Sequence, residues 1–338
     1  MLRMPELRYH HARSAAEAVQ RWSDLGGAVG RGKDAVWSAM YIAGGTDLLP
    51  NLKHRLFTPT HLVGLGGLPR GGVRDEGESL WIDGGITLAT LSEDPLVKRF
   101  FPPLAEAAGL VAGPQIRRMG TLGGNILLDT RCLFYNQTES WRKALGYCLK
   151  KDGTWCHVVG GPKTCVAAQS SDTVPVLLTA DAEILLLGPS GERALSLRKL
   201  YRYNGFDHLQ IEPGELLLGV RVPTPRGELR GRYLKLRPRG SIDFPQLGVA
   251  IASTFDGPSL RGLEIVIGAV NPQPKPVRGL DAFIGRGLDA EAIEAIAALV
   301  QQQTRPQESV AGDADWRRAM AAILTRRALG ELARAEAG

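Results

Sequence analysis

The stretch AGGTDLLPNLK, residues 43–53, places paired glycines and small polar residues directly after the apolar run VWSAMYI. A second stretch of the same kind, TLGGNI, follows at residues 121–126. Glycine lets a backbone approach a ligand closely, and successive exposed N–H groups form a concave site that suits a pyrophosphate. Ordinary strand-end turns use the same residues for steric reasons, so each turn alone leaves both interpretations open. Neither stretch has the spacing of a Rossmann fingerprint or a P-loop.

The sequence around these turns mixes helix and strand patterns, which predicts an α+β fold. Ser14 and Glu17 form a capping box, in which Glu17 can reach back to the N–H of Ser14, and the box predicts a helix that ends near Leu25. Residues 100–113 predict a short helix, and two C-terminal helices begin near Asp289 and Asp313. Apolar segments bounded by Gly and Pro predict strands at 36–42, 79–85, 215–223, 231–239 and 260–270. Residues 174–197 contain two further apolar runs, separated by a turn at 189–191.

The composition is that of an ordinary globular protein, with 44% hydrophobic and 22% charged residues in 338. No apolar run is long enough for a transmembrane helix and the N-terminus lacks the apolar core of a signal peptide, so we expect a cytoplasmic protein without membrane contact. The net charge of +6 is spread along the chain, and no Lys/Arg stripe alternates with aromatics. We therefore expect a docking face for other subunits and no nucleic-acid binding.

Four segments in this order resemble the FAD-binding subunits and domains of the molybdenum hydroxylases, the group of xanthine dehydrogenase and carbon monoxide dehydrogenase. They are AGGTDLLPNLK (43–53), TLGGNI (121–126), SSDTVPVLLTADAEILLL (170–187) and YLKLRPRGSIDFPQLGVAIA (233–252). The resemblance implies a two-part FAD-binding domain of the PCMH type at 1–225, divided into 1–60 and 61–225. A C-terminal α+β domain like that of the carbon monoxide dehydrogenase flavoprotein is expected at 226–338, with the boundary within the Pro/Arg-rich stretch 222–232.

Carried over position by position, the resemblance implies FAD contacts at both turns. It also implies a polar contact from Asp172 and a positive charge from Lys235 near the cofactor. Without the resemblance, Asp172 would be interpreted as a turn residue before Pro175, and Lys235 as a solvated lysine on a strand. A cation close to FAD would favour its more negative reduced form. The complete set is Ile42, Ala43, Gly44, Gly45, Thr46, Asp47, Leu48, Thr121, Leu122, Gly123, Gly124, Asn125, Asp172 and Lys235.

All four cysteines fall between residues 132 and 165, with the spacing C-x15-C-x7-C-x8-C. Asn125 and Asp172 are 47 positions apart, longer than the resemblance leads us to expect, so residues 129–168 are an insertion. Two disulfides would suit an oxidising compartment, and structural zinc usually shows closely spaced cysteine pairs, which are absent here. Four unrelated thiols clustered by chance are a further alternative. An iron–sulfur cluster needs four thiolates, which a wrapping loop can provide, and is favoured.

An inserted four-cysteine loop resembles that of the β subunits of 4-hydroxybenzoyl-CoA reductases, which implies a [4Fe-4S] cluster held by Cys132, Cys148, Cys156 and Cys165. His157 is then a neighbour of a ligand and not a ligand itself. Six cations outnumber two acids across the loop, which suits an anionic cluster and an acidic donor, although an exposed loop also needs charge to stay soluble. The cations are Arg131, Arg142, Lys143, Lys150, Lys151 and Lys163, and the acids are Glu139 and Asp152.

The resemblance implies an electron-transfer subunit of an oxidoreductase that removes the phenolic hydroxyl of 4-hydroxybenzoyl-CoA or a close relative. Electrons would enter from a ferredoxin-like donor at the cluster, pass to FAD, and leave through a small subunit with two [2Fe-2S] clusters to a large molybdenum subunit, in a dimer of heterotrimers. No residue is expected to act as an acid or base on that substrate. The alternatives are a flavoprotein subunit of another xanthine dehydrogenase-type hydroxylase, and a zinc-stabilised assembly module that binds no flavin.

Overall fold

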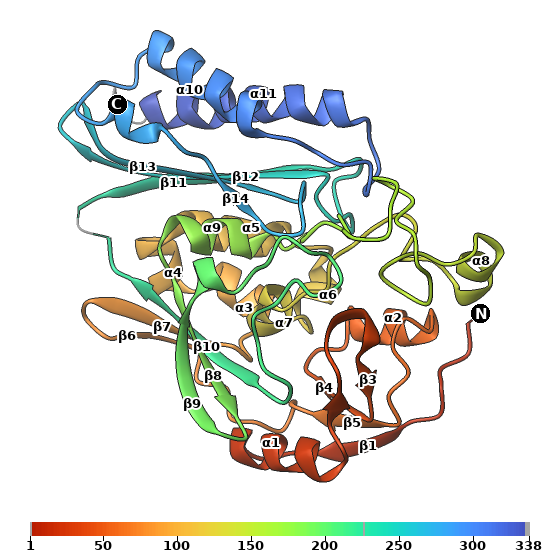
Figure 1. The fold of residues 1–338 in the computed structure, drawn as a ribbon. Helices are drawn as coiled ribbons and strands as arrows, with labels where there is room; N and C mark the ends of the chain where they lie inside the picture. The colour runs from red at the N-terminus through yellow and green to blue at the C-terminus, as the bar shows by residue number, and fades with distance from the viewer. Residues whose placement is uncertain (1, 226, 335–338) are drawn as a thin grey trace.

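Three larger β-sheets, one two-stranded sheet and the helices between and around them make up the part of the chain that the computed structural model describes, residues 2–225 and 227–334 (Figure 1). The expected α+β class is confirmed. Among the described residues, no helix has the length and apolar character needed to cross a membrane.

The first sheet is parallel, in the order β1 (Arg8–His11), β5 (His61–Gly64) and β4 (Ala39–Ile42). The first part of the FAD-binding domain is expected at residues 1–60. Because β5 begins at residue 61, the unit built on this sheet extends past that expected end. The predicted strand at 36–42 is two strands that part at Ser38. The other elements here are α1 (Ala15–Asp24), β2 (Ala28–Val29), η1 (Gly32–Asp34), β3 (Val36–Trp37) and α2 (Leu48–Lys53).

The predicted capping box begins α1 with one difference from the expected pairing. The Ser14 hydroxyl accepts the N–H of Glu17, as predicted. The Glu17 carboxylate, however, accepts the N–H of Arg13 and not that of Ser14. The helix ends at Asp24 and buries Ala18, Val19 and Trp22 against the first sheet, because these residues recur on one helical face.

The second sheet is antiparallel, in the order β6 (Val73–Asp75), β7 (Ser79–Asp83), β10 (Leu216–Pro223), β8 (Glu183–Gly188) and β9 (Gly191–Ser196). The apolar run that begins at 174 is helical before it becomes β8, since α9 covers Thr173–Thr179. The other helices of this part are α3 (Leu88–Glu93), α4 (Pro95–Phe100), α5 (Pro102–Leu110), α6 (Pro114–Arg117), α7 (Leu122–Ile126) and η2 (Leu197–Lys199).

The third sheet is antiparallel, in the order β11 (Leu229–Leu236), β12 (Leu247–Asp256), β13 (Ser259–Gly268) and β14 (Lys275–Pro276). Figure 1 shows α10 (Ala290–Gln303) and α11 (Ala314–Arg334) on one face of it and α5 and α9 on the other; η3 (Leu280–Phe283) precedes α10. Asp289 and Asp313 accept the N–H groups of Ala292 and Trp316, as the predicted caps should. The expected domain boundary at 226 and the expected end at 338 lie outside the described residues.

The cysteine segment leaves the body of the protein through a narrow neck. The N–H of Arg131 donates to the carbonyl of Ala168 at 2.8 Å, and the N–H of Ala168 donates back at 2.7 Å. Its only helix among the described residues is α8 (Glu139–Ala144), and the rest is tight turns. The segment forms the projection at the right of Figure 1.

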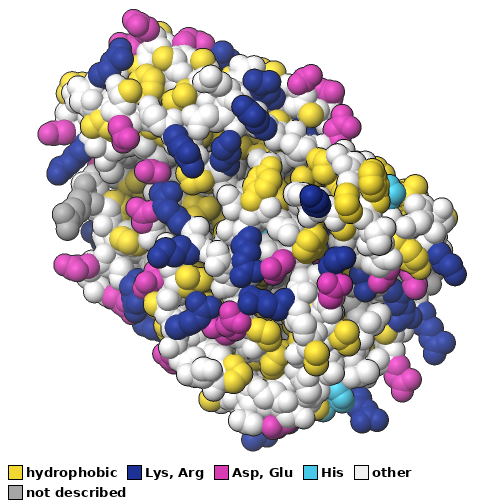
Figure 2. All heavy atoms as spheres, in the orientation of Figure 1, with side chains coloured by type: hydrophobic (Ala, Val, Ile, Leu, Met, Phe, Trp, Pro, Cys, Tyr) yellow, Lys and Arg dark blue, Asp and Glu magenta, His cyan; other side chains and the backbone are white. Residues whose placement is uncertain are grey.

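Hydrophobic side chains are exposed on this projection. They are Leu133, Trp141, Leu145, Trp155 and Val159. Figure 2 shows hydrophobic side chains gathered toward the same side of the molecule, while Lys and Arg are mixed with Asp and Glu over much of the visible face. The positive charge is therefore not concentrated in one stripe on this face, which agrees with its spread along the sequence.

Candidate functional site

A cavity of about 1240 Å³ lies among the ends of the first two sheets and reaches the third. Small-molecule sites usually measure about 300–1,000 Å³, so this one has room for a dinucleotide. It is lined by every residue of the predicted FAD set except Leu122, which is fully buried in the core of the second sheet. The two glycine turns, about 75 positions apart in the sequence, thus meet at one cavity.

The first turn presents free backbone donors to this cavity. Gly45 has φ +70°, a conformation that glycine adopts without strain. Among the described residues, no hydrogen bond uses the N–H groups of Gly44, Gly45 or Thr46. Three unpaired N–H groups in succession form the kind of concave site that binds a phosphate oxygen.

The second turn differs, because its own fold uses its donors. The N–H groups of Leu122 and Gly123 donate to the carbonyls of Ile86 and Gly84, and that of Asn125 donates to the carbonyl of Thr121. The N–H of Gly124 donates to the Thr121 hydroxyl at 3.1 Å. The concave donor site expected at both turns is therefore open only at the first.

The glycines of both turns are also required for packing. A Cβ on Gly44 would clash with the backbone of Met119, and a Cβ on Gly123 would lie 2.9 Å from the carbonyl oxygen of Gly84. Backbone atoms cannot move aside as a flexible side chain can. Glycine at position 44 thus lets the first turn approach the backbone just before the second turn, and glycine at position 123 lets the second turn approach the backbone that follows β7. The sequence alone assigns these glycines to ligand contact.

The polar side chains of the first turn are engaged within the protein. Asp47 forms an ion pair of 2.6 Å with Arg131 and accepts a hydrogen bond from Asn51 at 2.8 Å. Burial raises the pKa of Asp47, while the Arg131 charge acts in the opposite direction. The Arg131 guanidinium also lies 3.9 Å from the ring centre of Phe244. Asp47 therefore ties the first turn to the neck of the cysteine segment.

Asp172 and Lys235 form a buried ion pair of 2.8 Å at the cavity wall, with side-chain exposures of 3% and 1%. The Tyr233 hydroxyl donates to the other carboxylate oxygen at 2.8 Å, and Lys235 also donates to the carbonyl of Leu110. Burial raises the pKa of Asp172 and lowers that of Lys235. Lys235 is thus not a solvated lysine, and Asp172 offsets much of the positive charge that it would show to a cofactor.

The four cysteines, separated by up to 33 positions in the sequence, line one small cavity of about 20 Å³. Cys148, Cys156 and Cys165 are buried, Cys132 is partly exposed, and none forms a disulfide. The two-disulfide alternative is therefore not what the structure contains. In residues 2–225 and 227–334, no three His, Cys, Asp or Glu side chains converge closely enough for a single metal ion. This finding gives no support to a single tetrahedral zinc ion held by the cysteines.

Tight turns bring these thiols together. The N–H of Lys151 donates to the carbonyl of Cys148, and the N–H of Cys156 donates to the carbonyl of Gly161. Burial raises the pKa of Cys132 to about 12 and that of Cys165 to about 11, so these thiols are protonated unless a metal is bound. Four soft thiol donors around one point fit an iron–sulfur cluster. The cavity has room for about one water-sized sphere, so the turns must move outward around a cluster.

Most cations of the cysteine segment have a hydrogen-bond or ion-pair partner in the protein. Arg131 pairs with Asp47, Lys150 with Asp129, and Lys151 with Asp152. Arg142, only 1% exposed, donates to the carbonyls of Gln137, His54 and Arg55. Within the described residues, Lys143 and Lys163 have no ion-pair partner. The interpretation of these cations as a solvated face holds for those two, and it also fits Lys151, because the side chains of Lys151 and Asp152 are 27% and 46% exposed.

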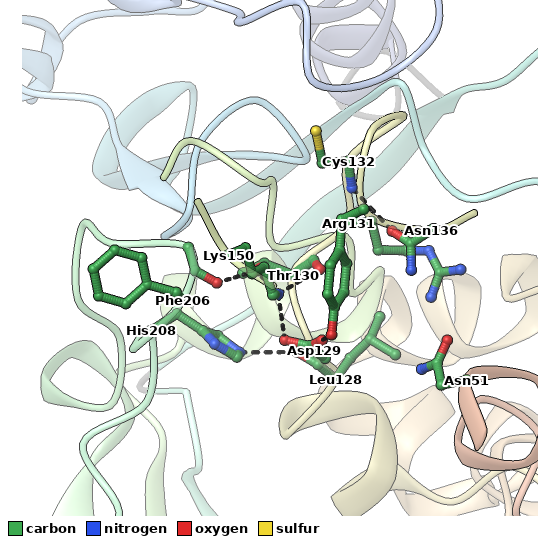
Figure 3. A network of polar contacts seen from close by, with 12 residues as sticks. Asn51, Leu128, Asp129, Thr130, Arg131, Cys132, Asn136, Lys150, Phe206 and His208 are labelled. Atoms are coloured by element: carbon green, nitrogen blue, oxygen red, sulfur yellow. Dashed lines mark hydrogen bonds and ion pairs between the residues drawn. The ribbon is translucent and has the colours of Figure 1, made fainter. Parts of the chain in front are cut away.

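A polar network at the neck was missed by sequence reasoning (Figure 3). Asp129 accepts from Lys150 at 2.6 Å and from the Tyr135 hydroxyl at 2.9 Å. Although burial opposes ionisation of Asp129, Lys150 and His208 hold its pKa below the usual value. Asp129 lies four positions after Asn125 without any motif, so only the tertiary structure reveals it. His157, the neighbour of Cys156, contacts the carbonyl of Tyr147 with its Nε2 atom.

Comparison with known proteins agrees with this arrangement. Residues 5–225 match the FAD binding domain in molybdopterin dehydrogenase, and residues 232–332 match the CO dehydrogenase flavoprotein C-terminal domain. The chain is 30% identical to the carbon monoxide dehydrogenase medium chain of Afipia carboxidovorans, over 97% of both chains. It is 32% identical to the aldehyde oxidoreductase FAD-binding subunit of Escherichia coli, over 75% of this chain and 81% of the relative.

Among solved structures, carbon monoxide dehydrogenase from Hydrogenophaga pseudoflava superposes with a TM-score of 0.78 at 27% identity, over 99% of both chains. The superposition covers all three sheets, and the first family match includes both glycine turns. The chain therefore belongs to the FAD-binding family of the molybdopterin dehydrogenases and is an FAD-binding oxidoreductase subunit of the molybdenum hydroxylase type.

Proposed function

We propose that this subunit serves a molybdenum enzyme that removes the phenolic hydroxyl of 4-hydroxybenzoyl-CoA or a close hydroxybenzoyl-CoA. Cys132, Cys148, Cys156 and Cys165 would hold a [4Fe-4S] cluster in it. The observation that carries the proposal is the pocket lined by all four cysteines. A flavoprotein that passes electrons outward to an acceptor has no need of such an insertion, whereas in a subunit fed by a low-potential donor a cluster in this segment would provide an entry point for electrons.

The residues that would hold FAD are those of the large cavity. The free N–H groups of Gly44, Gly45 and Thr46 suit its pyrophosphate, and the buried Asp172–Lys235 pair forms a rigid wall. FAD and an iron–sulfur cluster, when bound, supply the electron-transfer chemistry, and the protein supplies position and electrostatics. No side chain of this subunit acts on the hydroxybenzoyl-CoA.

The partners that we propose are a large molybdenum subunit and a small subunit with two [2Fe-2S] clusters, in a dimer of heterotrimers. One relative is named a medium chain and another an FAD-binding subunit, and both names denote one subunit of a larger enzyme. The exposed apolar side chains of the cysteine segment offer area for contact with a ferredoxin-like donor. Electrostatic steering of an acidic donor would rest on Lys143 and Lys163, and we propose a cytoplasmic location.

A second candidate is the flavoprotein subunit of another xanthine dehydrogenase-type hydroxylase. The similarity to the aldehyde oxidoreductase and carbon monoxide dehydrogenase subunits favours it. In that case the cysteine segment would be structural. The alternative of a zinc-stabilised module without flavin has no support, because the chain belongs to an FAD-binding family and no described group of side chains converges on a single ion.

The proposal is tested by the cofactor content of the chain after anaerobic purification. We expect about one FAD, four iron atoms and four acid-labile sulfides per chain, with flavin bands and a broad iron–sulfur absorption. Cys156→Ser should lose iron and sulfide and keep FAD. The matched control is His157→Gln, one position away, which should keep all three.

Other results would separate the candidates. Flavin without iron in the parent protein would contradict the cluster and favour the second candidate, and zinc in place of iron would leave only a flavoprotein with a structural metal. If iron is present, the assembled three-subunit complex should reduce 4-hydroxybenzoyl-CoA with a low-potential donor. Oxidation of an aldehyde or a heterocycle by that complex, without removal of the hydroxyl group from hydroxybenzoyl-CoA, would contradict the proposed substrate.

A further inference from the structure

Two residues separate the large cavity from the cysteine pocket. Among the described residues, Tyr135 and Lys150 are the two that line both spaces. They are 2% and 7% exposed, so they form an internal wall that bulk water barely reaches. Any electrostatic influence between the contents of the two spaces crosses this wall.

Lys150 is held in this wall as a fully bonded ammonium group. Its Nζ atom donates to Asp129 at 2.6 Å, to the Thr130 carbonyl at 2.9 Å and to the Thr130 hydroxyl at 2.6 Å (Figure 3). These three contacts match the three donors of an ammonium group. The same atom lies 4.2 Å from the ring centre of Tyr135, whose hydroxyl is bonded to Asp129. The charge is therefore fixed in position.

The ion pair has a direction relative to the two spaces. Lys150 lines the cysteine pocket and the large cavity, whereas Asp129 lines the large cavity alone. The positive end thus lies nearer to the thiols and the negative end nearer to the cavity. In a protein interior, charges interact much more strongly than in water, so this orientation acts differently on the two sides.

A purely structural wall would not need this arrangement. Replacing a buried ion pair by apolar residues of similar volume is often neutral or stabilising, because burying charges costs desolvation free energy. Exposed lysines on the same segment, such as Lys143, show that the loop can keep its cations in water. A cation buried against four thiols stabilises added negative charge there.

We propose that Lys150 is a positioning residue that raises the reduction potential of the group held by the four cysteines, with Asp129 fixing its ammonium group and lowering the potential of the flavin on the other side. This inference rests on the proposed function. It assigns a redox-tuning role to the shared wall, beyond the binding of either cofactor.

The test is an anaerobic redox titration of the purified chain, with the cluster followed by electron paramagnetic resonance and the flavin by absorbance. Lys150→Met should lower the cluster midpoint potential, with about a tenfold loss in the reduced-to-oxidised ratio at fixed potential, or about 59 mV for one electron. Lys150→Arg keeps the charge and should restore most of the shift. Asp129→Asn should raise the flavin potential and the cluster potential. Lys143→Met, which removes an exposed cation from the same segment, is the control and should change neither.

The outcomes distinguish this inference from the proposed function. Absence of iron and sulfide from the parent protein overturns both. An unmoved cluster potential in iron-loaded Lys150→Met, or an equal shift in Lys143→Met, overturns the redox-tuning role alone. If Lys150→Met does not retain iron, Asp129→Asn decides: a raised cluster potential supports the inference, and an unchanged one overturns it.

Discussion

At the scale of single residues, burial determines how the charged groups near the site behave. The Asp172–Lys235 pair and Lys150 are buried and hydrogen-bonded. Removing the partner of any of these charges would therefore lower the free energy of unfolding strongly. His208 lies near Asp129 and Lys150 at the neck, 7% exposed, with its Nε2 atom 3.1 Å from the carbonyl oxygen of Leu128. Burial lowers the pKa of His208 to about 4, so it is neutral in the folded protein near pH 7.

His208 predicts a specific pH dependence of stability. The unfolded side chain takes up a proton near its ordinary pKa of 6.5, while the folded one does so only near 4. The unfolded state therefore binds more protons between these values, and stability is fully present above pH 6.5 and decreases by about 3 kcal/mol as the pH falls to 4. His208→Gln should remove this part of the decrease, measured by urea unfolding at a series of pH values.

The control for this prediction is His11→Gln, because His11 is an exposed histidine on β1. It should leave the pH dependence of the unfolding free energy unchanged. The same slope between pH 4 and 6.5 in the parent protein and in His208→Gln would contradict the assignment of a neutral, buried His208.

At the scale of elements, the site depends on how closely each of the two glycine turns packs against neighbouring backbone. The first turn connects β4 to α2, and the second forms the start of α7. Gly44 and Gly123 permit contacts between backbones that any side chain would block. The open donors of the first turn are held in place by this packing, so the shape of the binding cavity follows from contacts between the elements.

Gly44→Ala should therefore weaken FAD binding and lower stability. The added methyl group would clash with the backbone of Met119, and overpacking of this kind typically costs about 1–3 kcal/mol. FAD content after purification and the midpoint of urea unfolding measure the two effects. Gly240→Ala is the matched control, since a Cβ there meets nothing within 4 Å. Full FAD content and unchanged stability in Gly44→Ala would contradict the packing role of this glycine.

At the scale of the whole molecule, the large cavity joins parts of the chain that are distant in sequence. Its lining includes residues of the first sheet, the second glycine turn, the neck of the cysteine segment and Lys235 of β11. A ligand that fills this space binds the folded state and not the unfolded chain. Folding and FAD binding are therefore coupled.

Removal of FAD should lower the melting temperature, and re-addition should restore it in a concentration-dependent way. At about 100 times the dissociation constant, FAD adds about 2.7 kcal/mol to the free energy of unfolding. Flavin mononucleotide lacks the adenosine and the pyrophosphate bridge, so it should stabilise less at equal concentration. Thermal unfolding at several concentrations of each flavin measures this, and equal stabilisation by both would contradict a cavity built for the dinucleotide.

The sequence by itself determined the α+β class, the family through four ordered segments that include the two glycine turns, and the unusual clustering of four cysteines. These features are local in sequence, because propensity, caps and glycine patterns act over a few residues. It did not reveal that the N–H groups of Leu122 and Gly123 are used internally, since their acceptors, Ile86 and Gly84, lie more than 30 positions away.

Only the tertiary structure decided which charges are free. Lys235 and Lys150 read as solvated cations in the sequence, yet the fold buries both and supplies Asp172 and Asp129 as partners. It also brought the four cysteines to one pocket and placed Tyr135 and Lys150 between that pocket and the large cavity. The physical reason is that burial and charge pairing depend on contacts between segments far apart in the chain, which no local pattern encodes.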